Sequence, residues 1–239
     1  MTTATERFLK YIAVNTTSVD DAKVYPSSPN QKVLGAQIAE EMKAMGLTDV
    51  IQDEYGYVMG TIPATRDKGP TIGLISHLDT SNAVSGGPIH PAFVDYQGGD
   101  IVLNKEQDIV MTPSAFPCLN EVKGKRLIVT DGTTLLGADD KAGVAEIMTL
   151  AERLLRPDAP KHGKIRIGFT PDEEVGEGTK FFDLEKFGAQ IAYTVDGGAL
   201  GELEYENFNV GYGNYHHQGR ERPYGKCQES NDQCGRCGL

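Results

Sequence analysis

Tryptophan is absent from the 239 residues, and no apolar run approaches the roughly 18 residues that a membrane-spanning helix needs. Residues 1–20 include Glu6 and Lys10 and lack the continuous apolar segment of a secretory signal peptide. We therefore expect a cytoplasmic protein with no membrane partner.

Basic residues are also scarce, with 23 Lys and Arg against 34 Asp and Glu, for a net charge of −11. A protein that binds nucleic acid needs clustered Lys and Arg to neutralise phosphates, so we expect no nucleic-acid partner. The four cysteines are too few and too unevenly spaced for a disulfide framework. The chain is nevertheless 39% hydrophobic, which is enough to bury a core.

Helical and strand patterns alternate along the chain, which predicts an α/β fold. A capping box at Thr3 and Glu6 opens one helix, and apolar stripes predict two more. Short apolar runs predict the strands. The expected elements are helices near 3–12, 30–45 and 139–155, and strands at 50–53, 57–62, 71–76, 126–130, 164–170 and 191–195.

Residues 80–121 carry no clear periodicity, because glycines and prolines interrupt them repeatedly. A structureless stretch of this length inside a compact domain is more often functional than idle. His90 lies within it, but most loop histidines are only solvated, so His90 is a weak candidate for a ligand.

Four polar clusters follow predicted strands, and each has an ordinary structural interpretation when taken alone. Residues 76–80 (SHLDT) are typical of a turn, residues 170–178 (TPDEEVGEG) of a solvated acidic edge, and residues 194–198 (TVDGG) of an Asx-turn. Asp139 and Asp140 come where Asp is preferred as a helix N-cap. Active sites of open α/β sheets lie beyond the carboxyl ends of strands, and all four clusters meet that condition. Their coincidence predicts a metal-dependent hydrolase.

A hydrolytic site with two metal ions needs a bridging carboxylate and terminal ligands for each ion. Asp139 is the best candidate for the bridge, with His77 as the nitrogen ligand. Glu174 and Asp196 would be terminal ligands.

Two carboxylates remain for other roles. Asp79 follows His77 by two residues, so both side chains point to the same side of an extended segment. Asp79 would then accept the second ring N–H of the histidine and fix its tautomer. Glu173 is left free to act as the general base that takes a proton from water.

The four motifs SHLDTS, TTLLGADDKAGVAEIM, FTPDEEVGEG and TVDGGALGELEYENFN resemble the peptidase T family of tripeptide aminopeptidases. The similarity extends from the first helix to about Asn209 and includes YQGGDIVL. It implies the N-terminal portion of a di-zinc peptidase catalytic domain, with a mixed central sheet flanked by helices. The substrates would be small peptides, from which the enzyme releases the N-terminal residue by metal-activated attack of water.

The resemblance also assigns roles to individual residues. It implies two Zn²⁺ ions per intact site, held by His77, Asp139 and Asp196 on one side and by Asp139 and Glu174 on the other. Asp79 and Glu173 would be the active-site carboxylates, with Glu173 as the general base. Lys141, next in the DDK triplet, is implied only as a structural neighbour.

The resemblance stops at about Asn209, where the family continues with a lid and dimerisation domain and a last histidine ligand. Residues 210–239 have Val210 and Leu239 as their only aliphatic side chains, too few for a packed structure. We interpret residues 1–209 as a partial catalytic domain and residues 210–239 as a non-native, disordered tail. We then expect the homodimer contacts to be lost and the activity to be weak or absent.

A shifted reading frame accounts for that tail. Permitted codons for residues 211–238, read one nucleotide downstream, give a strand-like and then helical sequence that resembles the start of the family's lid. A small zinc site is an alternative reading of the tail, because it contains one CxxC spacing. Its candidate ligands are His216, His217, Cys227, Cys234 and Cys237.

Two other functions remain open at this stage. A related metal-dependent deacylase or carboxypeptidase would use the same clusters, and assays of N-acylated amino acids against free tripeptides would separate it. The chain could also be a non-catalytic remnant, because the last histidine ligand of the family is missing.

Overall fold

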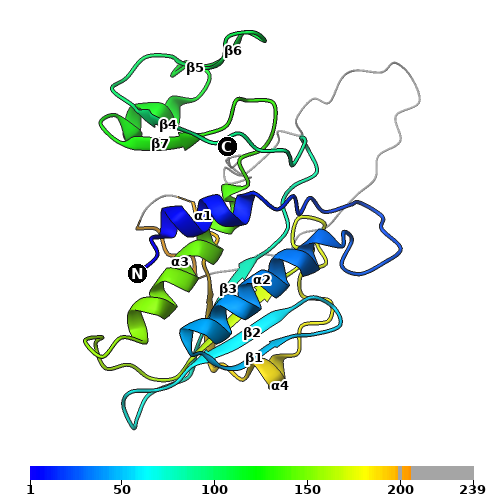
Figure 1. Ribbon diagram of the computed structural model, residues 1–239, viewed down its shortest axis with the longest axis vertical. Helices are drawn as coiled ribbons and strands as arrows, with labels where there is room; N and C mark the ends of the chain where they lie inside the picture. Colours follow the sequence, from blue (N-terminus) through cyan, green and yellow to red (C-terminus); the bar gives the residue numbers. More distant parts are fainter. Residues whose placement is uncertain (199–200, 206–239) are drawn as a thin grey trace. The chain divides into compact units, whose positions relative to one another are not determined.

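The computed structural model describes residues 1–198 and 201–205 (Figure 1). Residues 1–196 form one compact unit, which contains every helix and strand described below. The expectations for residues 210–239, including the zinc-binding alternative, lie outside the described residues.

Three long helices form where the sequence predicts them. α1 (Ala4–Ile12) begins at a complete capping box, in which Thr3 and Glu6 bond each other's backbone N–H. α2 (Asn30–Met45) ends at Gly46, which adopts φ 94° in the left-handed region that glycine tolerates. α3 (Ala138–Leu154) follows the DD motif, and α4 (Leu184–Phe187) is a single short turn.

The central sheet has five strands in the order β1-β2-β8-β3-β9. β1 and β2 form an antiparallel hairpin, β2 pairs antiparallel with β8, and β8, β3 and β9 run parallel. The sheet is therefore mixed, as the resemblance implied. The strands are β1 (Thr48–Gln52), β2 (Val58–Ile62), β3 (Ile72–His77), β8 (Ile165–Thr170) and β9 (Ile191–Thr194).

One face of this sheet is covered by α1, α2 and α3, and α1 lies beside α3 (Figure 1). The stripes predicted from the sequence supply this core, including Ile38 and Met42 of α2 and Val144 and Met148 of α3. On the other face Phe187 packs against strand glycines, where an added Cβ at Gly73 would lie 2.6 Å from its ring. The carboxyl ends of β3, β8 and β9 remain together at one edge of the sheet.

The expectation that residues 80–121 lack regular structure was wrong. β4 (Ala92–Asp95) pairs with β7 (Arg126–Val129), and β5 (Ile101–Asn104) pairs with β6 (Ile109–Met111). A 3₁₀ helix (Pro117–Val122) joins them around a small separate core. β4, β5 and β6 have three or four residues, too few for a periodicity to be recognised. The partner of β4 is β7, the strand expected at 126–130, which lies far along the chain.

The strand expected at 191–195 forms as β9, but all four of its residues are exposed, although an apolar run of this kind is typical of a buried strand. β9 is the last strand of the sheet and pairs only with β3 among the described residues. The side chains of Ile191 and Tyr193 are 54% and 45% exposed. Apolar composition indicated a strand here, but burial depends on neighbours that the sequence pattern does not specify.

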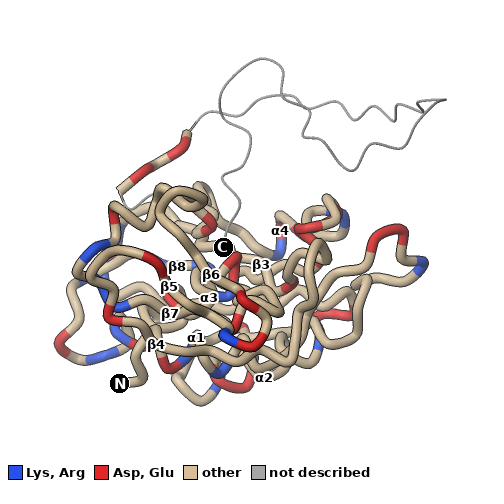
Figure 2. The backbone as a smooth tube through the Cα atoms, turned by 90° about the horizontal axis from the view of Figure 1, so that it is seen from above, with Lys and Arg blue, Asp and Glu red and all other residues tan. Residues whose placement is uncertain are grey.

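Within the described residues, no helix combines the length and apolar character needed to cross a bilayer. Figure 2 shows acidic positions distributed over many segments of the chain, in keeping with the net charge of −11.

Candidate metal centre

His77 is the central side chain of the site. It is the last residue of β3 and is almost completely buried. Its Nδ1 lies 3.0 Å from the backbone oxygen of Asp79, and its Nε2 lies 2.8 Å from Oδ1 of Asp139. Nδ1 can therefore donate to the carbonyl and leave Nε2 directed at the carboxylates.

Asp139 comes from the start of α3, but it does not cap the helix. The N-cap position belongs to Gly137, which has no side chain to bond the helix, and Asp139 and Asp140 both have non-helical backbone angles. The peptide between them is cis. The N-cap interpretation was therefore wrong for Asp139, which presents a half-exposed carboxylate to His77. Asp140 does cap the helix, because its Oδ1 accepts the backbone N–H of Gly143 three positions on.

The side chain of Asp140 points away from the ligand group and bonds the end of β3 to the start of α3. Its buried carboxylate accepts hydrogen bonds from the Ser76 hydroxyl, from the backbone N–H of His77 at 3.2 Å and from that of Gly143 at 3.1 Å. A Cβ at Gly143 would lie 2.0 Å from the backbone oxygen of Val195, so only glycine fits there. No role for Asp140 beyond a possible cap was predicted from the sequence, although the small residue three positions later was a usable signal.

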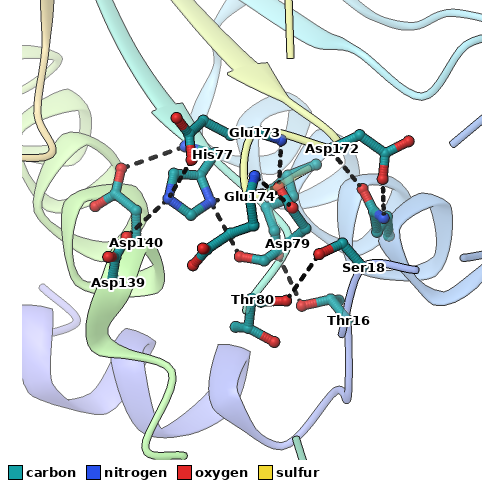
Figure 3. Close-up of polar contacts among 12 residues, drawn as sticks. Thr16, Ser18, His77, Asp79, Thr80, Asp139, Asp140, Asp172, Glu173 and Glu174 are labelled. Carbon is teal, nitrogen blue, oxygen red and sulfur yellow. Dashed lines mark hydrogen bonds and ion pairs between the residues drawn. The ribbon is translucent and has the colours of Figure 1, made fainter. Parts of the chain in front are cut away.

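The DEE loop, residues 171–178, follows β8 and supplies the remaining carboxylates (Figure 3). Its position is fixed by Asp79, whose carboxylate accepts the backbone N–H of Glu173 at 3.0 Å and of Glu174 at 3.1 Å. The Asp79 carboxylate lies 3.4 Å from Nδ1 of His77, farther than its own carbonyl oxygen. Asp79 thus orients the histidine mainly through its carbonyl, and its carboxylate serves the loop.

Three side chains from different elements converge at the centre of the site. Nitrogen and oxygen atoms of His77, Asp139 and Asp196 lie within 4.8 Å of one another. Asp196 follows β9, and its Oδ2 is 3.8 Å from Nε2 of His77. Glu173 reaches the same nitrogen at 3.9 Å with a side chain that is 54% exposed. Within the described residues, the six positions singled out by the sequence thus meet in one place.

The concentration of negative charge shifts several pKa values upward. Burial raises the pKa of Glu174 to about 7, and the charge of Asp139 adds to this effect. Burial likewise raises the pKa of Asp196 to about 6, with repulsion from Asp139 contributing. Burial alone would lower the pKa of His77, but hydrogen bonds with Asp139 and Asp79 raise it to about 11.

Many carboxylates lie close together around one histidine, and together with the burial of Glu174 and Asp196 they account for these raised pKa values. The histidine holds its proton more tightly than usual and the two carboxylates release theirs at a higher pH than usual, because each proton relieves repulsion among the carboxylates. A divalent cation would supply the same charge, and one imidazole with several carboxylates is a donor set that zinc accepts. His77, Asp139 and Asp196 therefore fit a metal ion, and the second ligand group expected from the sequence, Asp139 with Glu174, stays a prediction.

We expect the metal-free chain to lose stability as the pH rises from 5 to 8. In this window the folded state holds protons on His77, Asp140, Glu174 and Asp196 that the unfolded state has released or is releasing, because their folded pKa values are raised. A folded state that binds more protons becomes less stable as protons are removed. Melting temperatures measured with a chelator should fall across the window, and added zinc should raise them most at pH 8.

A matched scan of Glu174→Gln provides the control, since it removes one of the raised pKa values. Its melting temperature should fall less steeply between pH 5 and 7 than that of the wild-type chain. A melting temperature that rises with pH in the presence of the chelator would contradict this account of the site.

The other sequence candidates lie in different surroundings. Lys141 is buried, and its Nζ donates to the backbone oxygen of Val14 at 2.8 Å. Burial lowers its pKa to about 8. His90 lies near Asp131 and, within the described residues, is not part of the ligand group around His77. Cys118 is exposed and free.

No family model matches the chain, but curated proteins do. It is 55% identical over 207 residues to a protein named peptidase T from Geobacillus kaustophilus (strain HTA426), which covers 86% of this chain and 50% of that protein. It is 54% identical over 212 residues to peptidase T from Clostridium novyi (strain NT), covering 88% and 52%. The resemblance identified from the motifs is therefore confirmed, and the chain spans about half the length of the curated relatives it matches.

Solved structures give the same result for the fold. The chain is 26% identical to aminopeptidase PepT from Bacillus cereus ATCC 10987, with a TM-score of 0.58 over 82% of this chain and 43% of that one. A tripeptidase from Staphylococcus aureus subsp. aureus Mu50 gives 25% identity and a TM-score of 0.57 with the same coverage. These matches confirm the α/β fold class and correspond to part of a catalytic domain.

Proposed function

We propose that this chain, a peptidase T homologue over 86% of its length, carries the metal-binding half of a zinc-dependent tripeptide aminopeptidase. The observation that carries the proposal is the convergence of His77, Asp139 and Asp196 beside the free carboxylate of Glu173. Names of the relatives support a peptidase, and the donor set supports a metal-dependent one. A cytoplasmic location and peptide breakdown belong to the same proposal.

Zinc, when bound, would act as a Lewis acid that polarises a peptide carbonyl and makes a nearby water more acidic. The chain's own residues do the rest. Among the described residues, the carboxylate of Glu173 has no hydrogen-bonding partner, and it lies 3.9 Å from Nε2 of His77. The bond from the Glu173 backbone N–H to Asp79 keeps this residue beside the ligand group. It accepts the proton of the attacking water and donates it to the leaving amine.

The acidic character of the site also suits an aminopeptidase. A peptide with a free N-terminus carries an ammonium group there, which the negative field around Glu173, Glu174 and Asp196 would attract. An N-acylated amino acid lacks that positive charge. This difference favours a free peptide over the substrates of the related deacylases.

The function is tested with two proteins, because the chain spans half the length of its relatives. The first is the 239-residue chain, and the second is a completed protein that joins residues 1–209 to the C-terminal half of the Geobacillus kaustophilus relative. With zinc, the completed protein should hydrolyse leucyl-glycyl-glycine, and the shorter chain should do so weakly or not at all. The added half would supply a further metal ligand and a lid that excludes water, which would account for the difference.

The assay separates the alternatives. Turnover of N-acetylated amino acids instead of the tripeptide would favour a deacylase. No turnover by the completed protein, together with no zinc bound to either protein, would make the chain a non-catalytic remnant. Equal turnover by both proteins would show that the missing half is not required.

A further inference from the structure

Asp172 precedes the two site glutamates but does not take part in the site itself. Its side chain points away from His77, toward the segment that leads into α2 (Figure 3). It is 1% exposed, and its backbone adopts φ 55°, a left-handed angle that non-glycine residues rarely take. A buried carboxylate on a strained backbone persists only where its surroundings hold it in place.

The surroundings of Asp172 come from residues 25–31, far away in the sequence. The backbone N–H of Ser27 donates to Oδ2 at 2.6 Å, and the Ser27 hydroxyl donates to Oδ1 at 2.5 Å. Gln31 uses both ends of its amide: Nε2 donates to Oδ1 of Asp172 at 2.7 Å, and Oε1 accepts the backbone N–H of Asp172 at 3.0 Å. Gln31 is 0% exposed, so these bonds form away from water.

The same segment also holds the far end of the DEE loop. The hydroxyl of Tyr25 donates to the backbone oxygen of Glu177 at 3.2 Å. Within the loop, the N–H of Glu177 bonds the carbonyl of Asp172 at 2.9 Å, which closes the turn that contains both glutamates. Residues 25–31 therefore hold the loop at both ends, whereas Asp79 bonds its middle.

We propose that the Asp172–Gln31 pair is a positioning device that fixes the DEE loop, and with it the general base Glu173 and the metal ligand Glu174. The assignment of those two roles rests on the proposed function. Gln31 and Asp172 are joined by two hydrogen bonds, one that the Gln31 amide donates and one that it accepts. If Gln31 turned its amide over, its nitrogen would face the backbone N–H of Asp172, so both bonds require one orientation.

That requirement supplies a reciprocal test in the 239-residue chain. Asp172→Asn replaces one carboxylate oxygen with an N–H₂ group, which must face either the Nε2 donor of Gln31 or the backbone N–H of Ser27, so one of these two bonds is lost. In the double variant Asp172→Asn with Gln31→Glu, the N–H₂ group can face a carboxylate oxygen of residue 31, and the other oxygen accepts the backbone N–H of residue 172, so both bonds to residue 31 are restored. Asp183→Asn is the matched control, because Asp183 also bonds a backbone N–H, at the start of α4, but contacts neither glutamate.

The first measurement is amide hydrogen exchange of residues 172–178, which needs neither metal nor activity. Asp172→Asn should accelerate exchange there by about tenfold or more, since buried hydrogen bonds to a charged group are lost. Peptides from α3 should keep their rates, and the double variant should return the loop toward wild type. Unchanged loop exchange in Asp172→Asn, or acceleration of the whole chain to the same degree, would overturn the proposal.

The second measurement is a titration with Co²⁺, whose absorption spectrum reports the ligands around the ion. Asp172→Asn should weaken by about tenfold the Co²⁺ signal that depends on Glu174, and leave the signal that depends on His77 and Asp196. Equal weakening of both signals would mean a general structural role and would reject positioning. If the wild-type chain binds no Co²⁺, the proposed metal site fails, while the exchange measurement still decides whether the pair fixes the loop.

A milder variant covers the case in which Asp172→Asn does not fold. Ser27→Ala removes a hydroxyl that donates to Asp172 and accepts from Gln31 and Val19, but it keeps both bonds between Gln31 and Asp172, whereas Ser27→Thr keeps the hydroxyl. Ser27→Ala should accelerate loop exchange and Ser27→Thr should not. Identical exchange in the two Ser27 variants would contradict the proposal.

Discussion

Replacing Glu173 with glutamine in the completed protein is expected to lower kcat by roughly 10²- to 10⁴-fold, the range typical for loss of a general base. Glutamine has nearly the same shape, and the backbone N–H at this position would still bond Asp79. Its side-chain amide has no basic oxygen to accept a proton from water. The effect should therefore appear in kcat, with KM for leucyl-glycyl-glycine little changed.

Two controls make that result specific. Bound zinc, measured after dialysis, should equal that of the unsubstituted protein, because Glu173 is not among the proposed ligands. Glu177→Gln is the matched variant in the same loop, where the carboxylate pairs with Lys180 instead of facing His77. It should retain most of the activity. A Glu173→Gln enzyme with undiminished kcat would require a different base.

Removing the carboxylate of Asp139 is expected to lower the zinc content of the chain more than removing that of Glu174. Asp139 is the one residue proposed to contact both ions, and its carboxylate already lies 2.8 Å from Nε2 of His77. The hydrogen bond with His77 lowers the pKa of Asp139, so this carboxylate is ionised and ready to bind a cation. In Asp139→Asn, zinc in the dialysed 239-residue chain should fall from about one ion per chain to near zero.

Comparison with Glu174→Gln shows which site is affected. This substitution removes a ligand of the second ion only, so the zinc held by His77, Asp139 and Asp196 should remain. Asp67→Asn, in an exposed loop, should leave the zinc content unchanged. Zinc retained at full occupancy by Asp139→Asn would overturn the bridging role, and two tightly held ions in the wild-type chain would require a further ligand outside the described residues.

The sequence alone determined the helices, the strands of the central sheet and the identity of the candidate site. Periodic apolar residues specify α2 and α3, and Gly46 marks a helix end because it tolerates a left-handed backbone. The site was recognisable because one histidine and several carboxylates follow successive strands, whose ends a parallel arrangement brings together. The comparisons confirmed the resemblance to peptidase T and the fold class, and the roles of the individual residues stay predictions.

Tertiary structure decided what holds those residues in place. Asp140 bonds the backbone of His77, Asp79 bonds the backbone of Glu173, and Gln31 bonds Asp172 across 141 positions of the chain. β4, β5 and β6 were likewise not predicted, and neither was the pairing of β4 with the expected strand β7. Local patterns report which face of an element is apolar, whereas a hydrogen bond between distant segments depends on how the packed elements place two polar groups within about 3 Å of each other.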